Sequence, residues 1–174
     1  MKKYISFVFA LLLCIGIADS AKYIEVDKKI NVLRLIDGDS TIMKIRCCVG
    51  RGYGQKTRQG DHKTPEGTYK IHMIQPSDSW PHDFHDGRGP VRGTYGPWFF
   101  RLNTPQSTHV GLHGTSAPET IGTRDSDGCV RMHNDDLLKL KPHVFNGMEV
   151  VILPDVVSDP TPIASIMKLL VPRS

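Results

Sequence analysis

The residues best suited to chemistry are a cysteine and a histidine in the segment from Thr108 to Arg131. A cysteine acts as a nucleophile only as the thiolate, and a nearby imidazole is the group best able to take its proton near neutral pH. We therefore expect Cys129 to be a nucleophile and His113 to be its general base and acid. The alternative is that Cys129 is a buried small apolar residue and His113 a satisfied surface histidine.

Strand alternation indicates which histidine faces the cysteine. On a short strand from His109 to His113, the two histidines point to one face, and the intervening Val110 and Leu112 point to the other. This pattern predicts buried aliphatic side chains and freely exposed histidines. The polar segment 115–127 is then long enough to form a loop that brings the cysteine back over the end of the strand.

Length and net charge limit the classes of protein to which the chain can belong. With 174 residues, of which 39% are hydrophobic, the chain is large enough for one domain with a core of its own. The net charge of +4 is only mildly basic and includes lysines at the N-terminus. No arginine-rich run with interleaved aromatic residues occurs, so we do not expect nucleic acid as a partner.

Residues 1–20 have the features of a secretory signal peptide, with cleavage near residues 18–21. Lys2 and Lys3 precede an apolar run from Ile5 to Ile17, and small residues follow it. This run is shorter than the roughly 20 residues of a membrane-spanning helix, although a retained anchor is an alternative. We expect an exported protein, in the periplasm or cell wall of a bacterium, that contacts the membrane only through the transient signal peptide.

The cysteine count also supports a free thiol. Cys14 leaves with the signal peptide, which leaves an odd number of cysteines, Cys47, Cys48 and Cys129, in an exported chain. Adjacent cysteines seldom bridge each other because the geometry is strained, and on a strand they face opposite ways. We expect Cys47 and Cys48 to pack in the core.

The order of the remaining segments predicts a mostly β fold, a sandwich or barrel with one or two short helices. A helix is expected to start at Asn134 as its N-cap and to end at Pro142, and 155–174 to be a tail. The segments 50–67 and 75–96 are expected to be long loops, the second a lid or insertion. Strands are expected at 23–26, 30–36, 41–49, 68–74, 98–102, 109–113 and 148–153.

A zinc site is a weaker interpretation of the histidines. His82 and His85, together with His109 and His113, supply imidazoles, which are common zinc ligands. Their spacing matches no familiar ligand pattern, and histidines in polar loops are usually solvated. We therefore expect neither a metal nor a cofactor.

Two motifs in the same segment resemble a known family. His113-Gly114-Thr115, followed by the run SDGCVR at 126–131, resembles the active-site signature of the L,D-transpeptidase catalytic domain, also called the YkuD domain. KTPEGTY at 63–69 resembles the TPxG stretch of that family, and YGPWF at 95–99 resembles its segment ahead of the histidine strand. The resemblance covers about 23–153, which places a catalytic domain at 23–154, and it implies a β-sandwich-like fold with minor helices.

The resemblance also implies roles for individual residues. Cys129 would attack the carbonyl that joins a diamino acid to D-alanine in a peptidoglycan tetrapeptide stem, and D-alanine would leave as a thioester forms. His113 would move the protons, with the main-chain carbonyl of Gly114 fixing its tautomer. Main-chain N–H groups at Gly128 and Cys129 would hold the oxyanion, since glycine allows close approach. The residues expected to contact the substrate are Thr115, Ser126, Asp127 and Arg131.

The sequence leaves open the effect of Asp127, the role of Arg131 and the identity of the acceptor. Asp127 stands where many members of the family have histidine, and its carboxylate would raise the pKa of the neighbouring thiol unless Arg131 or Arg124 offsets it. Arg131 fits equally well a substrate carboxylate or an ion pair with Asp125 or Asp127. The acceptor is a second stem, a lysine of an envelope protein, or water, and a non-catalytic module that only binds peptidoglycan is a further alternative.

Overall fold

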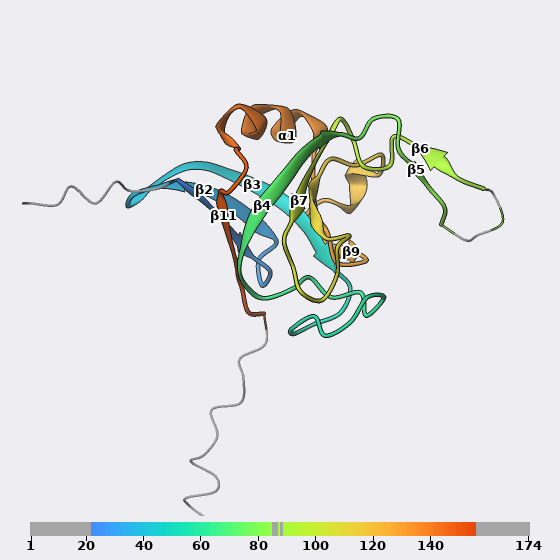
Figure 1. Cartoon of the computed structure of the whole chain (residues 1–174), viewed down its shortest axis with the longest axis horizontal. Helices are drawn as coiled ribbons and strands as arrows, with labels where there is room; N and C mark the ends of the chain where they lie inside the picture. The colour runs from blue at the N-terminus through green and yellow to red at the C-terminus, as the bar shows by residue number, and fades with distance from the viewer. Residues whose placement is uncertain (1–21, 85–86, 88, 156–174) are drawn as a thin grey trace, which may run out of the picture.

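The computed structural model describes residues 22–84, 87 and 89–155 of the chain (Figure 1). The predicted signal peptide and nearly all of the predicted tail lie outside these residues. The described part is mostly β with one short α-helix, which confirms the predicted fold class. No helix in this part of the chain is both long and apolar enough to cross a membrane.

The strands form one large sheet and a small hairpin. The sheet order is β10-β8-β7-β4-β11-β1-β2-β3-β9, and a further pairing of β10 with β3 closes the sheet on itself. The hairpin of β5 and β6 projects from the body of the domain (Figure 1). The strands are β1 (Tyr23–Asp27), β2 (Val32–Asp37), β3 (Ser40–Gly50), β4 (Gly67–Pro76), β5 (Pro81–His82), β6 (Val91–Arg92), β7 (Trp98–Leu102), β8 (Gly111–His113), β9 (Arg124–Ser126), β10 (Val130–Met132) and β11 (Glu149–Leu153).

Alternation along the strands builds the core. Ile24 and Val26 of β1 are fully buried, and so are Leu33 and Leu35 of β2, while the residues between each pair are partly exposed. Such a pattern fits strands with one face on the core and one toward solvent. Cys47 belongs to the core cluster, and both it and Cys48 are free and fully buried.

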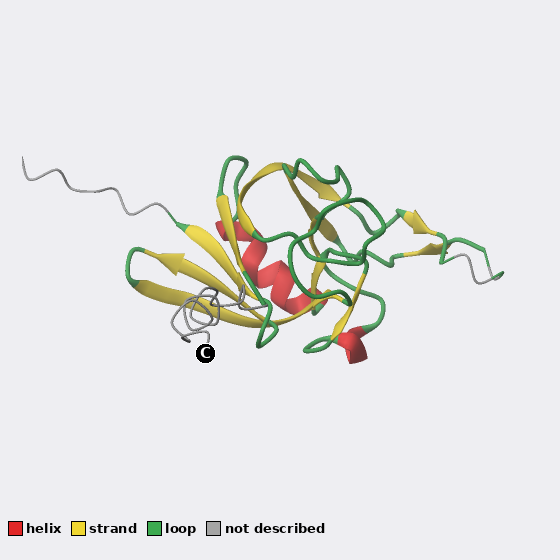
Figure 2. Cartoon of the chain, turned by 90° about the horizontal axis from the view of Figure 1, so that it is seen from below, coloured by secondary structure: helices red, strands yellow, loops and turns green. Residues whose placement is uncertain are grey.

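The helix α1 (Asn134–Leu140) lies at the top of the domain in Figure 1, Figure 2 shows it from below, and its Leu137 and Leu140 are buried in the core cluster. Its N-cap is His133, so the prediction that Asn134 caps the helix is wrong. The side chain of Asn134 turns toward the main chain of Thr115 instead. A 3-10 turn, Lys141–His143, contains Pro142 and follows the helix directly.

Two predicted loops contain regular elements. The segment 115–127 holds a 3-10 turn at Pro118–Thr120 and then β9, which pairs in parallel with β3. The segment 75–96 holds the β5–β6 hairpin. These elements are too short for sequence periodicity to reveal, because a strand of two or three residues completes hardly one alternation.

A buried lysine fixes the long 51–67 loop to the sheet. Lys28 is fully buried, and its ammonium donates to Glu66 Oε1 at 2.9 Å and to the main-chain oxygens of Thr64 at 3.0 Å and Gly54 at 3.2 Å. Asp155, with a side chain that is also fully buried, lies 3.6 Å from the same ammonium. A buried charge persists only where such partners replace its water, so this loop is held in one position.

We expect Lys28→Ala to lower the free energy of unfolding by about 3–5 kcal/mol, because it removes the buried cation from Glu66 and leaves Asp155 with only Arg124, 2.7 Å away, as its cationic partner. Denaturant unfolding followed by circular dichroism measures the change. Lys29→Ala is the matched control, since Lys29 is exposed, and it should stay within about 0.5 kcal/mol of the parent. Equal effects of the two substitutions would contradict the buried network.

Candidate active site

The site lies on one face of the β7, β8 and β10 region. β8 and β10 run parallel, with Leu112 opposite Val130 and His113 opposite Arg131. Cys129 directly precedes β10, so alternation puts its side chain on the face of Arg131, beside Gly111 of β8. The opposite face of these strands is apolar: Trp98 is partly buried there, and the fully buried side chains are Phe100, Leu102, Leu112, Val130 and Met132.

His113 is packed rather than exposed. It is 2% exposed, and the Phe99 ring of β7 stacks on it with a centroid distance of 5.2 Å and an interplanar angle of 13°. The Tyr95 ring contacts it edge-on at 5.1 Å. The expectation of freely exposed histidines is therefore wrong for His113, because strand alternation does not show that an aromatic side chain from β7 covers that face.

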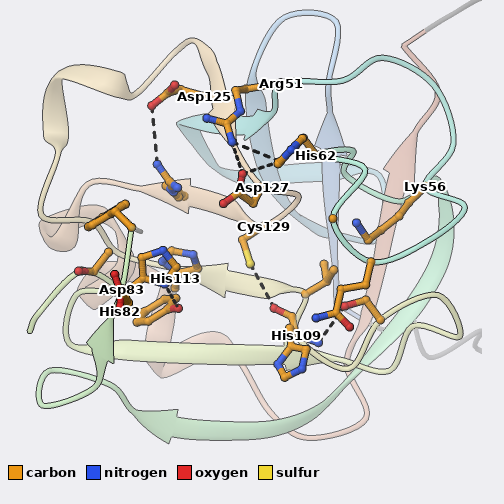
Figure 3. Close-up of a pocket in the computed structure, with 18 residues that line it drawn as sticks. Arg51, Lys56, His62, His82, Asp83, His109, His113, Asp125, Asp127 and Cys129 are labelled. Carbon is orange, nitrogen blue, oxygen red and sulfur yellow. Dashed lines mark hydrogen bonds and ion pairs between the residues drawn. The ribbon is translucent and has the colours of Figure 1, made fainter. Parts of the chain in front are cut away.

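Gly111 makes room for this packing. A Cβ atom at Gly111 would lie 2.2 Å from the Phe99 ring, so any larger residue would push the ring away from His113. His109 was predicted to lie on the same strand, yet β8 begins only at Gly111, and His109 is exposed. The main-chain oxygen of His109 accepts a hydrogen bond from the Cys129 thiol at 3.4 Å (Figure 3).

Burial keeps the His113 imidazole neutral. It lowers the pKa of His113 to about 3, helped by the nearby Arg131 guanidinium and opposed by the main chain of Gly114 and Tyr95. Nδ1 lies 2.6 Å from the Gly114 carbonyl oxygen, the contact expected from the sequence. Since a carbonyl only accepts, Nδ1 carries the hydrogen, and Nε2 is the nitrogen left to accept a proton.

Asn134, which was predicted to cap the helix, holds the Gly114 carbonyl in place instead. Asn134 Oδ1 accepts a hydrogen bond from Thr115 N at 2.9 Å. Cβ atoms at Gly96 and Gly114 would lie 2.3 and 2.1 Å from that same oxygen, so both glycines are needed for the close approach. The 5% exposed Thr115 is tied into this turn, where its hydroxyl accepts from Ala117 N at 2.9 Å.

The turn before Cys129 is organised by Ser126. Ser126 is fully buried; its Oγ donates to Cys129 O at 2.6 Å and accepts from Gly128 N at 3.1 Å. Gly128 has φ +129, and a Cβ there would lie 2.6 Å from Lys63 O. Because Gly128 N–H is engaged by Ser126, the expected oxyanion contact at Gly128 requires Ser126 to release that donor.

The Cys129 thiol is partly exposed and rests as the neutral thiol. Burial raises its pKa, while Gly111 N–H, Arg131 and Lys56 oppose the rise and Asp127 adds to it. No hydrogen bond joins its sulfur to His113 among the residues that the structure describes. Both side chains line the same cavity of about 700 Å³, which is where a substrate carbonyl would meet them (Figure 3).

Asp127 has its own partners at the mouth of this cavity. It pairs with the Arg51 guanidinium, and His62 Nδ1 lies 2.7 Å from Asp127 Oδ1. Burial works against its ionisation, but His62 and Arg51 outweigh it and hold the pKa of Asp127 below its ordinary value. Arg51 and His62, which the sequence did not indicate, are therefore the main residues that offset the Asp127 charge, and Arg131, which the sequence did indicate, adds to their effect.

The two arginines considered as partners of Asp127 have other contacts. Arg124 donates to Lys28 O at 3.1 Å and to Gly52 O at 2.6 Å, so it serves the loop network. Arg131 lies 3.9 Å from Asp125 and remains on the cavity wall. As to zinc, no group of three or more His, Cys, Asp or Glu side chains within the described ranges is placed to hold a metal ion, and His85 lies outside them.

Residues 21–152 match the family model YkuD, described as the L,D-transpeptidase catalytic domain. The chain belongs to this family. A Bacillus licheniformis protein that bears the name L,D-transpeptidase YkuD is 33% identical over 122 residues, covering 70% of this chain and 59% of that protein. The chain thus spans less than two thirds of the length of this relative.

Solved structures share the fold. The catalytic domain of the Enterococcus faecium L,D-transpeptidase has a TM-score of 0.57 at 18% identity, over 77% of this chain and 98% of that one. The cell-shape-determining protein Pgp2 of Campylobacter jejuni has a TM-score of 0.57 at 21% identity, over 80% and 50%. At these identities the likeness concerns the architecture of the L,D-transpeptidase domain alone.

We expect the His113 ring to stay neutral from pH 7.5 down to pH 4.5, because a group with a pKa of about 3 is deprotonated throughout that range. Side-chain ¹⁵N NMR of the imidazoles measures this, with Nδ1 protonated and Nε2 not. His113→Gln identifies the resonance by its loss. A titration of this ring between pH 6 and 7 would contradict the buried, neutral base.

Proposed function

We propose that this protein is an exported cysteine L,D-transpeptidase that acts on peptidoglycan tetrapeptide stems and transfers them to an amine. The observation that carries the proposal is the shared cavity: the neutral His113 opens into it from β8, and Cys129 from the turn directly before the adjacent β10. Membership of the L,D-transpeptidase family supports it further. Neither observation identifies the acceptor, so the product is part of the test.

In the first half-reaction, Cys129 Sγ attacks the carbonyl between the diamino acid and D-alanine as His113 Nε2 takes the thiol proton. Since the thiol is neutral at rest, proton transfer accompanies attack, and a base that is itself neutral is required. The resulting oxyanion lies against the turn at Gly128 and Cys129. His113 then delivers its proton to the D-alanine nitrogen, which leaves, and a thioester remains.

In the second half-reaction, an amine attacks the thioester carbonyl. His113 accepts the amine proton and returns a proton to the leaving Cys129 sulfur, so the free enzyme is regenerated. Arg131, whose side chain is 17% exposed on the cavity wall, suits a carboxylate of the stem through two-pronged hydrogen bonding. Ser126 and Thr115 support the catalytic turns from within, since both are buried and bonded to main chain.

The place of action follows from the N-terminal sequence in this proposal. A charged start, an apolar run and small residues within 1–20 suit export, after which peptidoglycan stems are within reach. The amine then comes from a second stem, which yields a 3-3 crosslink, or from a lysine of an envelope protein. Water in place of an amine would make the protein an L,D-carboxypeptidase.

The direct test is covalent capture. Incubated with a tetrapeptide donor or a carbapenem, the protein should gain one adduct at Cys129, detected by intact mass and located by peptide mapping. His113→Ala should slow acylation by about 10²-fold or more, the usual cost of losing a general base.

His109→Ala is the matched control, because His109 contributes only its main-chain oxygen to the thiol, and acylation should be unchanged. Product analysis with purified muropeptides then distinguishes dimers from tripeptides, and so an amine from water as acceptor. Retained binding to peptidoglycan with no adduct at Cys129 would favour a non-catalytic binding module and refute the enzyme.

A further inference from the structure

Lys56 is buried in the wall of the cavity, where removing its charge from water costs free energy. Its side chain is 2% exposed, and Nζ lies 2.7 Å from Asp61 Oδ1, on a side chain that is 8% exposed. Taking both charges out of water costs several kcal/mol per ion before their attraction is counted. A lysine in a loop is ordinarily solvated, so burial of this pair beside the thiol calls for a reason other than stability.

The loop is shaped to keep Asp61 in place as the partner of Lys56. The two carboxylate oxygens accept from the N–H groups of Thr57 at 2.8 Å, Arg58 at 3.2 Å and Lys63 at 3.1 Å. Burial alone would raise the pKa of Asp61, but Lys56 and these N–H groups hold it well below its ordinary value. The carboxylate therefore stays charged and fixes the lysine ammonium.

The ammonium lies against the turn that carries the nucleophile. A Cβ atom at Gly128 would be only 3.3 Å from Lys56 Nζ. Lys56 also lines the same cavity as Cys129, and Figure 3 shows it on the side of that cavity opposite His113. The thiol thus has a neutral base on one side and a buried cation on the other.

Other titratable side chains also face the thiol, and the charged ones among them, including Arg131, are more exposed than Lys56. From the 51–67 loop and the β9–β10 region come Arg51, His62, Asp125, Asp127 and Arg131, in addition to Lys56. From the β8 segment and the segment before β7 come His109, His113, His82, Asp83 and Tyr95. Of all these, Arg131 and Lys56 favour the Cys129 thiolate and Asp127 disfavours it.

We propose that Lys56 is a positioning residue for the nucleophile: held by Asp61 beside Gly128, its ammonium stabilises negative charge on Cys129. This inference rests on the proposed function for its purpose, since only a reacting cysteine needs a stabilised thiolate. The buried location makes the field effective, because solvent and salt screen a buried charge much less than an exposed one. The Asp61 carboxylate offsets that field in part, so the two members of the pair act on the thiol in opposite directions.

The test measures the pH dependence of Cys129 alkylation by iodoacetamide in the full chain, followed by peptide mass spectrometry at Cys129. Lys56→Met should raise the midpoint by roughly 0.5–1 unit, because it removes a cation and leaves Asp61 unopposed. Asp61→Asn should lower the midpoint by a similar amount, because it frees the lysine charge while the one asparagine oxygen can still accept from the N–H groups of Thr57 and Arg58. Lys56→Arg should keep the midpoint near that of the parent.

Opposite signs separate the proposal from a structural role, which would move both single variants the same way. Lys70→Met, at an exposed lysine on β4, is the control for net charge and should leave the midpoint unchanged. If Lys56→Met fails to fold by circular dichroism, Asp61→Asn alone decides, and an unchanged or raised midpoint overturns the proposal.

Failure of this inference is distinguishable from failure of the proposed function. Alkylation requires no donor stem, so opposite midpoint shifts without any stem adduct would keep the role of Lys56 and reject the transpeptidase. A stem adduct at Cys129, together with the same alkylation midpoint in the Lys56 and Asp61 variants, would support the transpeptidase and reject the role of Lys56.

Discussion

The parallel register of β8 and β10 is the constraint on which the site depends. It sets His113 opposite Arg131 and brings Cys129, directly before β10, beside Gly111, so nucleophile and base share a face. A shift of one residue would turn His113 into the core and Leu112 into the cavity. The apolar row on the opposite face, from Phe100 to Met132, makes that shift very costly, so core packing enforces the register of the site.

Burial of His113 follows from the same arrangement and determines its chemistry. An imidazole under the Phe99 ring cannot be solvated as a cation, so it stays neutral and can receive a proton over a wide pH range. The same desolvation disfavours the Cys129 thiolate. Burial therefore keeps the base unprotonated but weakens it as a proton acceptor, and it also disfavours the thiolate, so cations and N–H groups around the sulfur have to favour the charged form.

Much of the architecture could be predicted from the sequence because runs of β-branched residues and turn residues indicate strands and turns from neighbouring positions alone. The strands β1 to β3 and the free cysteines in the core follow from short-range patterns, whereas the contact between His113 and Gly114 was expected from the family resemblance. The predictions that were wrong concern side chains whose contacts come from residues distant in the sequence. The cover over His113 comes from β7, and the side chain of Asn134 is claimed by Thr115 rather than by the end of its own helix.

The ion pairs around the cavity also join residues that are distant in the sequence or whose burial no local pattern shows. Asp127 suggested repulsion of the thiolate, but Arg51 and His62 come from a loop far away in the chain to balance it. No local pattern marks Lys56 as buried, since its burial depends on Asp61 and on Gly128. The Arg51–Asp127 pair is about half exposed and is screened by salt, whereas the buried Lys56–Asp61 pair is screened much less. Sequence reasoning singled out neither of these two pairs, because both join residues whose contact depends on the folded loop, and the buried pair is the less screened of the two.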